Sequence, residues 1–144
     1  MRAVLQRVTS ARVEVEGEVV GAIDRPGLLA LVGVTHDDGP EQVERMARKI
    51  AELRILDDES SLLDVGGQVL VVSQFTLYGE VSKGRRPSWS AAASAPDAEP
   101  VIADLVRALA DRGLRVAQGR FRATMSVELV NDGPFTLWLD TNDR

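Results

Sequence analysis

Apolar and charged residues alternate at the start of the chain with the two-residue period of a half-buried strand. The alternation runs through residues 3–8 and again through residues 11–16, and it predicts two consecutive strand segments. Glu16-Gly17-Glu18 then supplies a turn, so we predict that residues 19–23 return as the partner strand of a hairpin.

A second turn is predicted at Asp24-Arg25-Pro26-Gly27, because proline and glycine stand at consecutive positions there. The apolar run 28–34 that follows is typical of a strand buried on both faces. The last two predicted strands are joined as a tight hairpin through Asn131-Asp132-Gly133-Pro134. The later predicted strands are residues 68–72, 114–117, 124–130 and 135–139.

Two segments show helical periodicity instead. The first helix opens at residues 37–40, and the second runs from near Asp97 to Gly113. Between them, residues 79–100 lose all periodicity and predict a long surface connection. The order of elements predicts one α+β domain over residues 1–144, with a largely antiparallel sheet and two main helices packed outside it. The apolar faces contain Val43, Met46, Ala47, Ile50 and Leu53 in the first helix and Val101, Ile102, Leu105, Val106 and Leu109 in the second.

Composition places the chain among ordinary globular proteins, with 44% hydrophobic and 27% charged residues. The longest apolar runs fall far short of the roughly 20 residues of a membrane helix, so no membrane association is expected. The N-terminus has no secretory pattern, and a cytoplasmic location is predicted. The net charge of −5 argues against broad binding to nucleic acid, which leaves Lys83-Gly84-Arg85-Arg86-Pro87 as a local contact or as a solvated loop.

Several kinds of chemistry are excluded by the residues present. The chain has no cysteine and one histidine, His36, so thiol catalysis and metal sites built from two histidines are excluded. No Walker motif or strand-linked GxGxxG is present, which argues against nucleotide hydrolysis and dinucleotide redox chemistry. We expect neither a metal nor a cofactor.

Two segments remain as candidate sites. Ser73-Gln74-Phe75-Thr76-Leu77 follows a buried strand, and its amide, hydroxyls and backbone N–H groups suit the polar end of a pocket; the alternative is a strand that continues through Leu77. Asn131-Asp132-Gly133-Pro134 is either a hairpin turn or part of the site.

Four motifs in order resemble bacterial D-aminoacyl-tRNA deacylases: residues 1–8, Ser73 to Leu77, residues 83–88, and Asn131 to Pro134. The resemblance spans essentially the whole chain. It implies a barrel-like fold with a mixed or antiparallel sheet, and a homodimeric hydrolase of D-aminoacyl-tRNA and of glycyl-tRNA mischarged on tRNA-Ala. The partners are the 3′ end of aminoacyl-tRNA and a second copy of the chain.

The same resemblance implies residue roles. In the family, a glycine-proline turn with a cis peptide enters the partner's pocket, where its carbonyls hold the substrate amino group and exclude an L side chain. That role falls to Gly133 and Pro134, braced by Arg7. Catalytic positions are Gln74, Phe75 and Thr76; Ser73 and Met125 contact substrate, and Lys83, Arg85 and Arg86 contact tRNA phosphates.

Three questions stay open at this point. Thr76 is a candidate nucleophile, but the sequence gives no evidence of a base that would activate its hydroxyl, so we favour backbone oxyanion binding with help from the tRNA 2′-hydroxyl. Arg122 and Phe135 depart from the glycine and valine that are usual in the family. Two alternatives are an editing enzyme for L-aminoacyl-tRNA with a trans glycine-proline bond and a noncatalytic dimeric module that binds tRNA ends.

Overall fold

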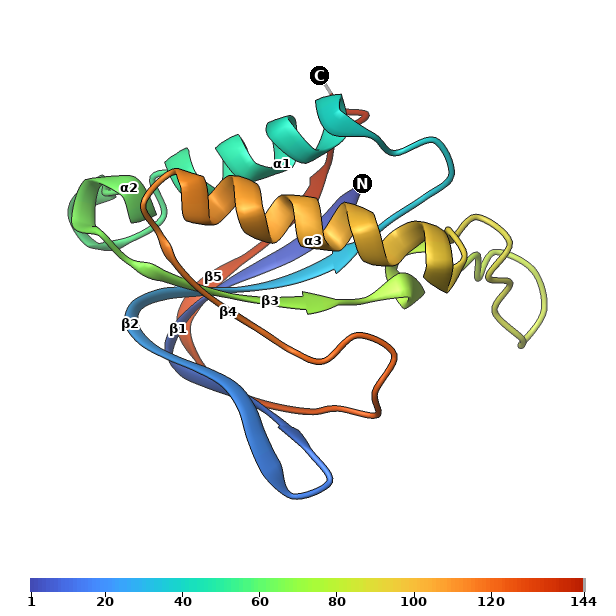
Figure 1. The fold of residues 1–144 in the computed structure, drawn as a ribbon, viewed down its shortest axis with the longest axis horizontal. Helices are drawn as coiled ribbons and strands as arrows, with labels where there is room; N and C mark the ends of the chain where they lie inside the picture. Colours follow the sequence, from blue (N-terminus) through green and yellow to red (C-terminus); the bar gives the residue numbers. More distant parts are fainter. Residues whose placement is uncertain (144) are drawn as a thin grey trace.

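The alternating N-terminal segment forms one long strand, β1 (Arg2–Val15), which pairs on both sides. The computed structural model describes residues 1–143. Its five-stranded sheet has the order β4-β3-β2-β1-β5 (Figure 1). β1 is antiparallel to β2 (Glu18–Gly33) and to β5 (Ser126–Asp140), whereas β3 (Gln68–Ser73) and β4 (Arg115–Gln118) extend the sheet in parallel from β2. A mixed sheet in an α+β protein is therefore confirmed.

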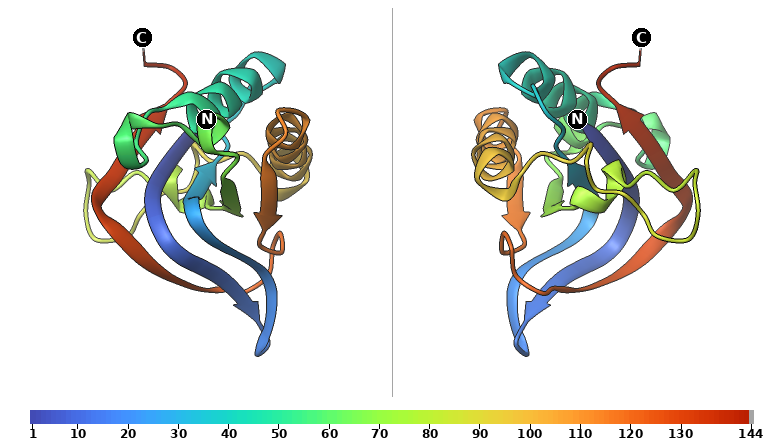
Figure 2. Two further views of the ribbon diagram at one scale, coloured as in Figure 1. Left: turned by 90° about the vertical axis from the view of Figure 1, so that its left-hand side faces the viewer. Right: turned by 90° about the vertical axis from the view of Figure 1, so that its right-hand side faces the viewer.

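Two long helices, α1 (Pro40–Glu52) and α3 (Ala95–Asp111), lie side by side over one face of the sheet (Figures 1 and 2). α1 begins at a proline, and the Gln42 side chain accepts from the Gly39 N–H at 2.8 Å. α3 begins two residues before the predicted Asp97 and ends before Gly113, which has a φ of 87°. Short helical turns complete the chain: η1 (Asp57–Glu59), α2 (Leu62–Val65) and η2 (Phe75–Tyr78).

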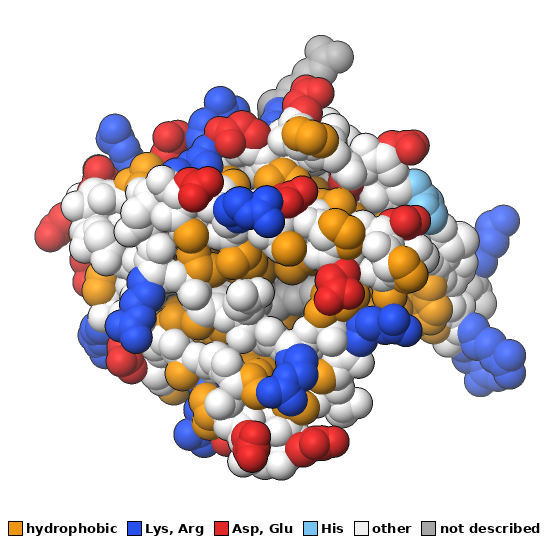
Figure 3. All heavy atoms as spheres, in the orientation of Figure 1, with side chains coloured by type: hydrophobic (Ala, Val, Ile, Leu, Met, Phe, Trp, Pro, Cys, Tyr) orange, Lys and Arg blue, Asp and Glu red, His pale blue; other side chains and the backbone are white. Residues whose placement is uncertain are grey.

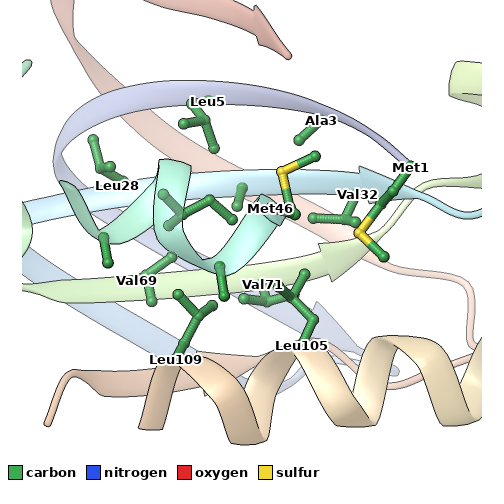
Figure 4. Packing of buried hydrophobic residues seen from close by; sticks show 14 of the residues in the cluster. Met1, Ala3, Leu5, Leu28, Val32, Met46, Val69, Val71, Leu105 and Leu109 are labelled. Carbon is green, nitrogen blue, oxygen red and sulfur yellow. The ribbon is translucent and has the colours of Figure 1, made fainter. Parts of the chain in front are cut away.

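Alternate residues of β2 and β3 supply two cores on opposite faces of the sheet. On the helix face, Leu28 and Val69 pack with Met46 of α1 and with Leu105 and Leu109 of α3 (Figure 4). On the other face, the sheet curls (Figure 2), and Leu29 and Leu70 belong to a second buried cluster. Residues 28–34 are all buried except Leu31, which is half-buried, so the prediction of a buried run is confirmed. The strand itself ends at Gly33.

The chain does not reverse at either of the two predicted turns that contain proline, so both turn predictions are wrong. β2 runs through Asp24–Gly27 without a break, and β5 runs through Asn131–Pro134. Each segment is instead a bulge against β1, because β1 is long enough to pair with the chain on either side of it. Arg25 and Pro26 are the extra residues opposite Thr9, and residues 132–135 are the extra residues opposite Arg7. The Arg25–Pro26 and Gly133–Pro134 peptide bonds are cis.

No helix within residues 1–143 has the length and apolar character needed to cross a membrane.

Candidate functional site

A cavity of about 660 Å³ opens beyond the carboxyl end of β3. Ser73, Gln74 and Phe75 form one wall, and the first residues of α3 form another. The segment that links β4 to β5 closes a third side and contributes Met125. The cavity is lined by Val32, Val34, Val72, Ser73, Gln74, Phe75, Trp89, Ala92, Ala93, Ser94, Ala95, Ala98, Ile102, Phe121, Arg122, Ala123, Met125 and Val127.

The wall at Ser73–Phe75 runs from the end of β3 into the 3₁₀ turn η2, which decides between the two interpretations of this motif. The Gln74 N–H still donates to the Val32 carbonyl at 2.7 Å, as a strand residue would, but the chain then coils into η2. Gly33 allows this: a Cβ there would lie 2.9 Å from the Gln74 carbonyl oxygen and 3.1 Å from the Leu77 Cβ. The predicted alternative of a strand continuing through Leu77 is wrong.

The start of η2 presents backbone donors. A 3₁₀ helix leaves its first N–H groups without intrahelical acceptors. Leu77 donates to the Gln74 carbonyl at 3.2 Å, whereas the N–H groups of Phe75 and Thr76 have no protein acceptor within residues 1–143. Two adjacent free amides beside a cavity can bind an oxyanion.

The side chains of the motif contain no acid-base pair. The Gln74 amide donates to Thr76 Oγ1, and no carboxylate or imidazole within residues 1–143 is hydrogen-bonded to that hydroxyl. His36 lies elsewhere, with Nε2 at 2.8 Å from the Ser90 carbonyl oxygen. Of the residues that line the cavity, only Arg122 is charged. The geometry therefore offers Thr76 no general base from the protein.

Met125 and Arg122 hold the third side of the cavity. A Cβ on Gly119 would lie 2.7 Å from Met125 Sδ, so the missing side chain makes room for the thioether. Arg122 has a φ of 67°, a conformation that glycine adopts at lower cost. This accounts for the glycine that is usual at the position in the resembling family.

The turn at Gly133 and Pro134 does not line this cavity. Both residues are exposed in the bulge of β5, an edge strand of the sheet. Within one chain, the structure therefore does not bring the two predicted site segments together.

Arg7 and Asn131 fix the shape of this turn. Arg7 Nε donates to the Asp132 carbonyl at 2.9 Å, and its guanidinium lies 4.2 Å from the centroid of the Phe135 ring. Asn131 Nδ2 donates to the carbonyls of Arg7 and Phe135 at 2.9 and 3.2 Å. Phe135, the larger residue noted in the sequence, therefore serves as the platform for the Arg7 guanidinium.

Lys83, Arg85 and Arg86 are exposed in the connection between η2 and α3. Lys and Arg side chains protrude at the right-hand end of the molecule in Figure 3, where this connection lies in Figure 1. None of the three makes an ion pair within residues 1–143.

The sequence analysis did not identify Arg2, whose side chain contacts Leu77 and Tyr78 of η2. Its Nη1 donates to the Leu77 carbonyl at 3.0 Å, its guanidinium lies 4.4 Å from the centroid of the Tyr78 ring, and its Nε bonds Asp140 at 3.1 Å. Burial acts to raise the pKa of Asp140, but hydrogen bonds from the Asn142 N–H and Arg2 outweigh it and leave that pKa below its usual value.

We expect Arg2→Leu to lower the free energy of unfolding by about 1–3 kcal/mol, because the Leu77 carbonyl and Asp140 both lose a charged donor. Asp140 now contributes stability above about pH 4 that is lost as the pH falls through its lowered pKa. In the variant the pKa of Asp140 rises, so the free energy of unfolding starts to fall at a higher pH as the solution is acidified. Urea unfolding between about pH 3 and 7 measures both effects.

Arg12→Leu is the matched control for this variant. Arg12 also lies on β1, but it pairs with Glu128 at the surface, so its loss is expected to cost less than about 1 kcal/mol. Equal losses for the two variants would show that Arg2 does not support η2.

Comparison with known proteins gives a consistent result. The family model described as D-Tyr-tRNA(Tyr) deacylase matches residues 4–140. A D-aminoacyl-tRNA deacylase of Kineococcus radiotolerans is 64% identical over 140 residues, covering 97% of this chain and 99% of that protein. One of Thermobifida fusca is 61% identical over 140 residues, with the same coverage.

Two solved structures share the fold. The c-Myc DNA Unwinding Element Binding Protein superposes with a TM-score of 0.90 at 38% identity, covering 97% of this chain and 98% of that one. A probable eukaryotic D-amino acid tRNA deacylase has a TM-score of 0.77 at 17% identity, covering 96% and 97%, and shows similarity of fold alone.

Proposed function

Since the chain belongs to the D-Tyr-tRNA(Tyr) deacylase family, we propose that its cavity binds the 3′ end of D-aminoacyl-tRNA and that the protein hydrolyses the ester bond there. Free tRNA and a D-amino acid are released. The observation that carries the proposal is the pair of unpartnered N–H groups of Phe75, which lines the cavity, and of the adjacent Thr76.

These amides stabilise the oxyanion that forms when water attacks the ester carbonyl. Fixed donors aimed at a developing negative charge accelerate acyl transfer without an ionisable side chain. Gln74 orients the Thr76 hydroxyl, and Ser73 and Met125 shape the space around the substrate. The attacking water loses a proton, the tRNA's own 2′-hydroxyl relays it to the 3′-oxygen, and that oxygen leaves as a hydroxyl when its bond to the carbonyl carbon breaks. The tRNA supplies this relay because the protein places no base beside Thr76. No metal or cofactor takes part.

We further propose that the active form is a homodimer in which Gly133 and Pro134 enter the partner's cavity. Three features support this: the turn is exposed, Arg7 and Asn131 hold its shape, and β5 is an edge strand with exposed Val130 and Trp138. Main-chain carbonyls at the turn would bind the substrate amino group and exclude an L side chain at the α carbon. Glycyl-tRNA mischarged on tRNA-Ala lacks a side chain and would be accepted.

Lys83, Arg85 and Arg86 contact tRNA phosphates, and the enzyme acts in the cytoplasm on its tRNA substrates.

The paired hydrolysis of D-tyrosyl-tRNA and L-tyrosyl-tRNA tests this function. With a chelator present, we expect the D ester to be hydrolysed and the L ester to survive, because selection is steric and no metal is used. Release of labelled tyrosine over time measures both rates. Equal rates for the two esters would reject chiral selection, faster hydrolysis of the L ester would favour the L-editing alternative, and binding without turnover would favour the noncatalytic module.

A further inference from the structure

Trp89 is an exposed aromatic side chain at the rim of the cavity that no part of the proposed reaction uses. Trp89 is 43% exposed and Phe75 is 55% exposed. Their rings lie edge to face, at 5.3 Å between centroids and 73° between planes. Both rings line the cavity. Large aromatic side chains left open to solvent at a binding site are suited to stacking with a planar ligand.

The backbone holds Trp89 firmly in this position. The six-membered part of its ring packs on Gly79, where a Cβ would lie 2.6 Å from Cζ3. On one side of Trp89, Glu80 and Ser88 exchange backbone hydrogen bonds of 2.8 and 2.9 Å. On the other side, the Ala92 N–H donates to the Trp89 carbonyl at 3.0 Å, and Thr35 Oγ1 donates to the Ala91 carbonyl at 2.6 Å. The exposed ring is therefore preorganised.

The charges around Trp89 indicate what it binds. The bridge between Glu80 and Ser88 closes a loop that carries Lys83, Arg85 and Arg86, so Trp89 directly follows a loop with three exposed cations. Cations beside stacking aromatics are the combination that binds single-stranded nucleic acid, in which phosphates meet the charges and bases meet the rings.

We propose that Trp89 stacks on the nucleobase that precedes the terminal adenosine of tRNA, while Phe75 contacts the terminal nucleotide. The inference rests on the proposed function, since it places the 3′ end in this cavity. The steep angle between the two rings requires the two bases to separate from each other, as bases of single-stranded RNA do when proteins splay them onto aromatic side chains.

Two single-tryptophan variants test the stack by fluorescence. Trp89 and Trp138 are the two tryptophans of the chain, so Trp138→Phe leaves Trp89 as the reporter and Trp89→Phe leaves Trp138 as its matched control. We expect uncharged tRNA to change Trp89 emission, tRNA without its single-stranded 3′ end to leave it unchanged, and Trp138 emission to respond to neither. Unchanged Trp89 emission at tRNA concentrations where anisotropy of labelled tRNA shows binding would overturn the proposal.

Steady-state kinetics on D-tyrosyl-tRNA provide a second readout. Trp89→Ala is expected to raise KM by about 5- to 100-fold with kcat within about twofold, because a lost base stack removes binding from ground and transition states alike. Trp89→Phe keeps a stacking face and is expected to stay within about threefold of the original KM. A fall in kcat with KM unchanged would overturn the proposal.

The two experiments also separate this inference from the proposed function. If the unmodified protein hydrolyses D-tyrosyl-tRNA but Trp89 emission does not respond to tRNA, only the stack is rejected. If it hydrolyses neither D-tyrosyl-tRNA nor glycyl-tRNA, the proposed function is rejected, and the stack, which depends on that function, is rejected with it.

Discussion

Replacing Thr76 with proline is expected to lower kcat on D-aminoacyl-tRNA by about 10²- to 10³-fold, whereas Thr76→Ala keeps most of the activity. Proline removes one of the two unpartnered backbone donors at the start of η2, and alanine removes only the hydroxyl. If the transition state is stabilised by the amide, the two variants separate by that factor. Single-turnover hydrolysis of D-tyrosyl-tRNA measures the chemical step directly.

The fold tolerates this substitution because Thr76 stands in the first turn of η2. Its N–H has no protein acceptor within residues 1–143, so proline there breaks no hydrogen bond of the fold. Thermal unfolding of both variants should therefore remain close to that of the original protein. Complete loss of activity in Thr76→Ala with tRNA binding intact would instead restore the threonine hydroxyl as the nucleophile.

Mixing two inactive variants is expected to recover about a quarter of the original activity, if the site is shared between subunits. Gly133→Val damages the turn, because a Cβ at Gly133 would lie 2.9 Å from Asn131 Oδ1 and displace the side chain that clamps the turn. Thr76→Pro damages the cavity of the same chain. After subunits exchange, half of the dimers are mixed, and each mixed dimer has one site with both parts intact.

The measurement is deacylation of D-tyrosyl-tRNA before and after the two proteins are denatured together and refolded. Each variant refolded alone is the control and should stay inactive. If the mixture also stays inactive while its dimers contain both chains, the turn and the cavity do not form a shared site. If Gly133→Val alone keeps full activity, the turn has no part in the reaction.

Local patterns predicted most of the elements of this fold. The apolar faces of the two long helices, the buried run at residues 28–34 and the strand at residues 68–72 all lie where periodicity placed them, because each pattern is set by neighbouring residues. The segments around Pro26 and Pro134 were not predictable in this way. Whether such a segment reverses the chain or bulges depends on its pairing partner, and β1 is remote in sequence from β5.

The candidate site was also predictable only in part, for the same reason. The motifs, the absence of cysteine chemistry and, through the resemblance, the family could all be read from the sequence alone. Three further features became visible in the folded chain: Gly33 makes room for η2, Arg2 supports η2 and Trp89 flanks it, and the Gly133–Pro134 turn lies outside the cavity of its own chain. These are contacts between residues far apart along the chain, which folding brings together and no local pattern records.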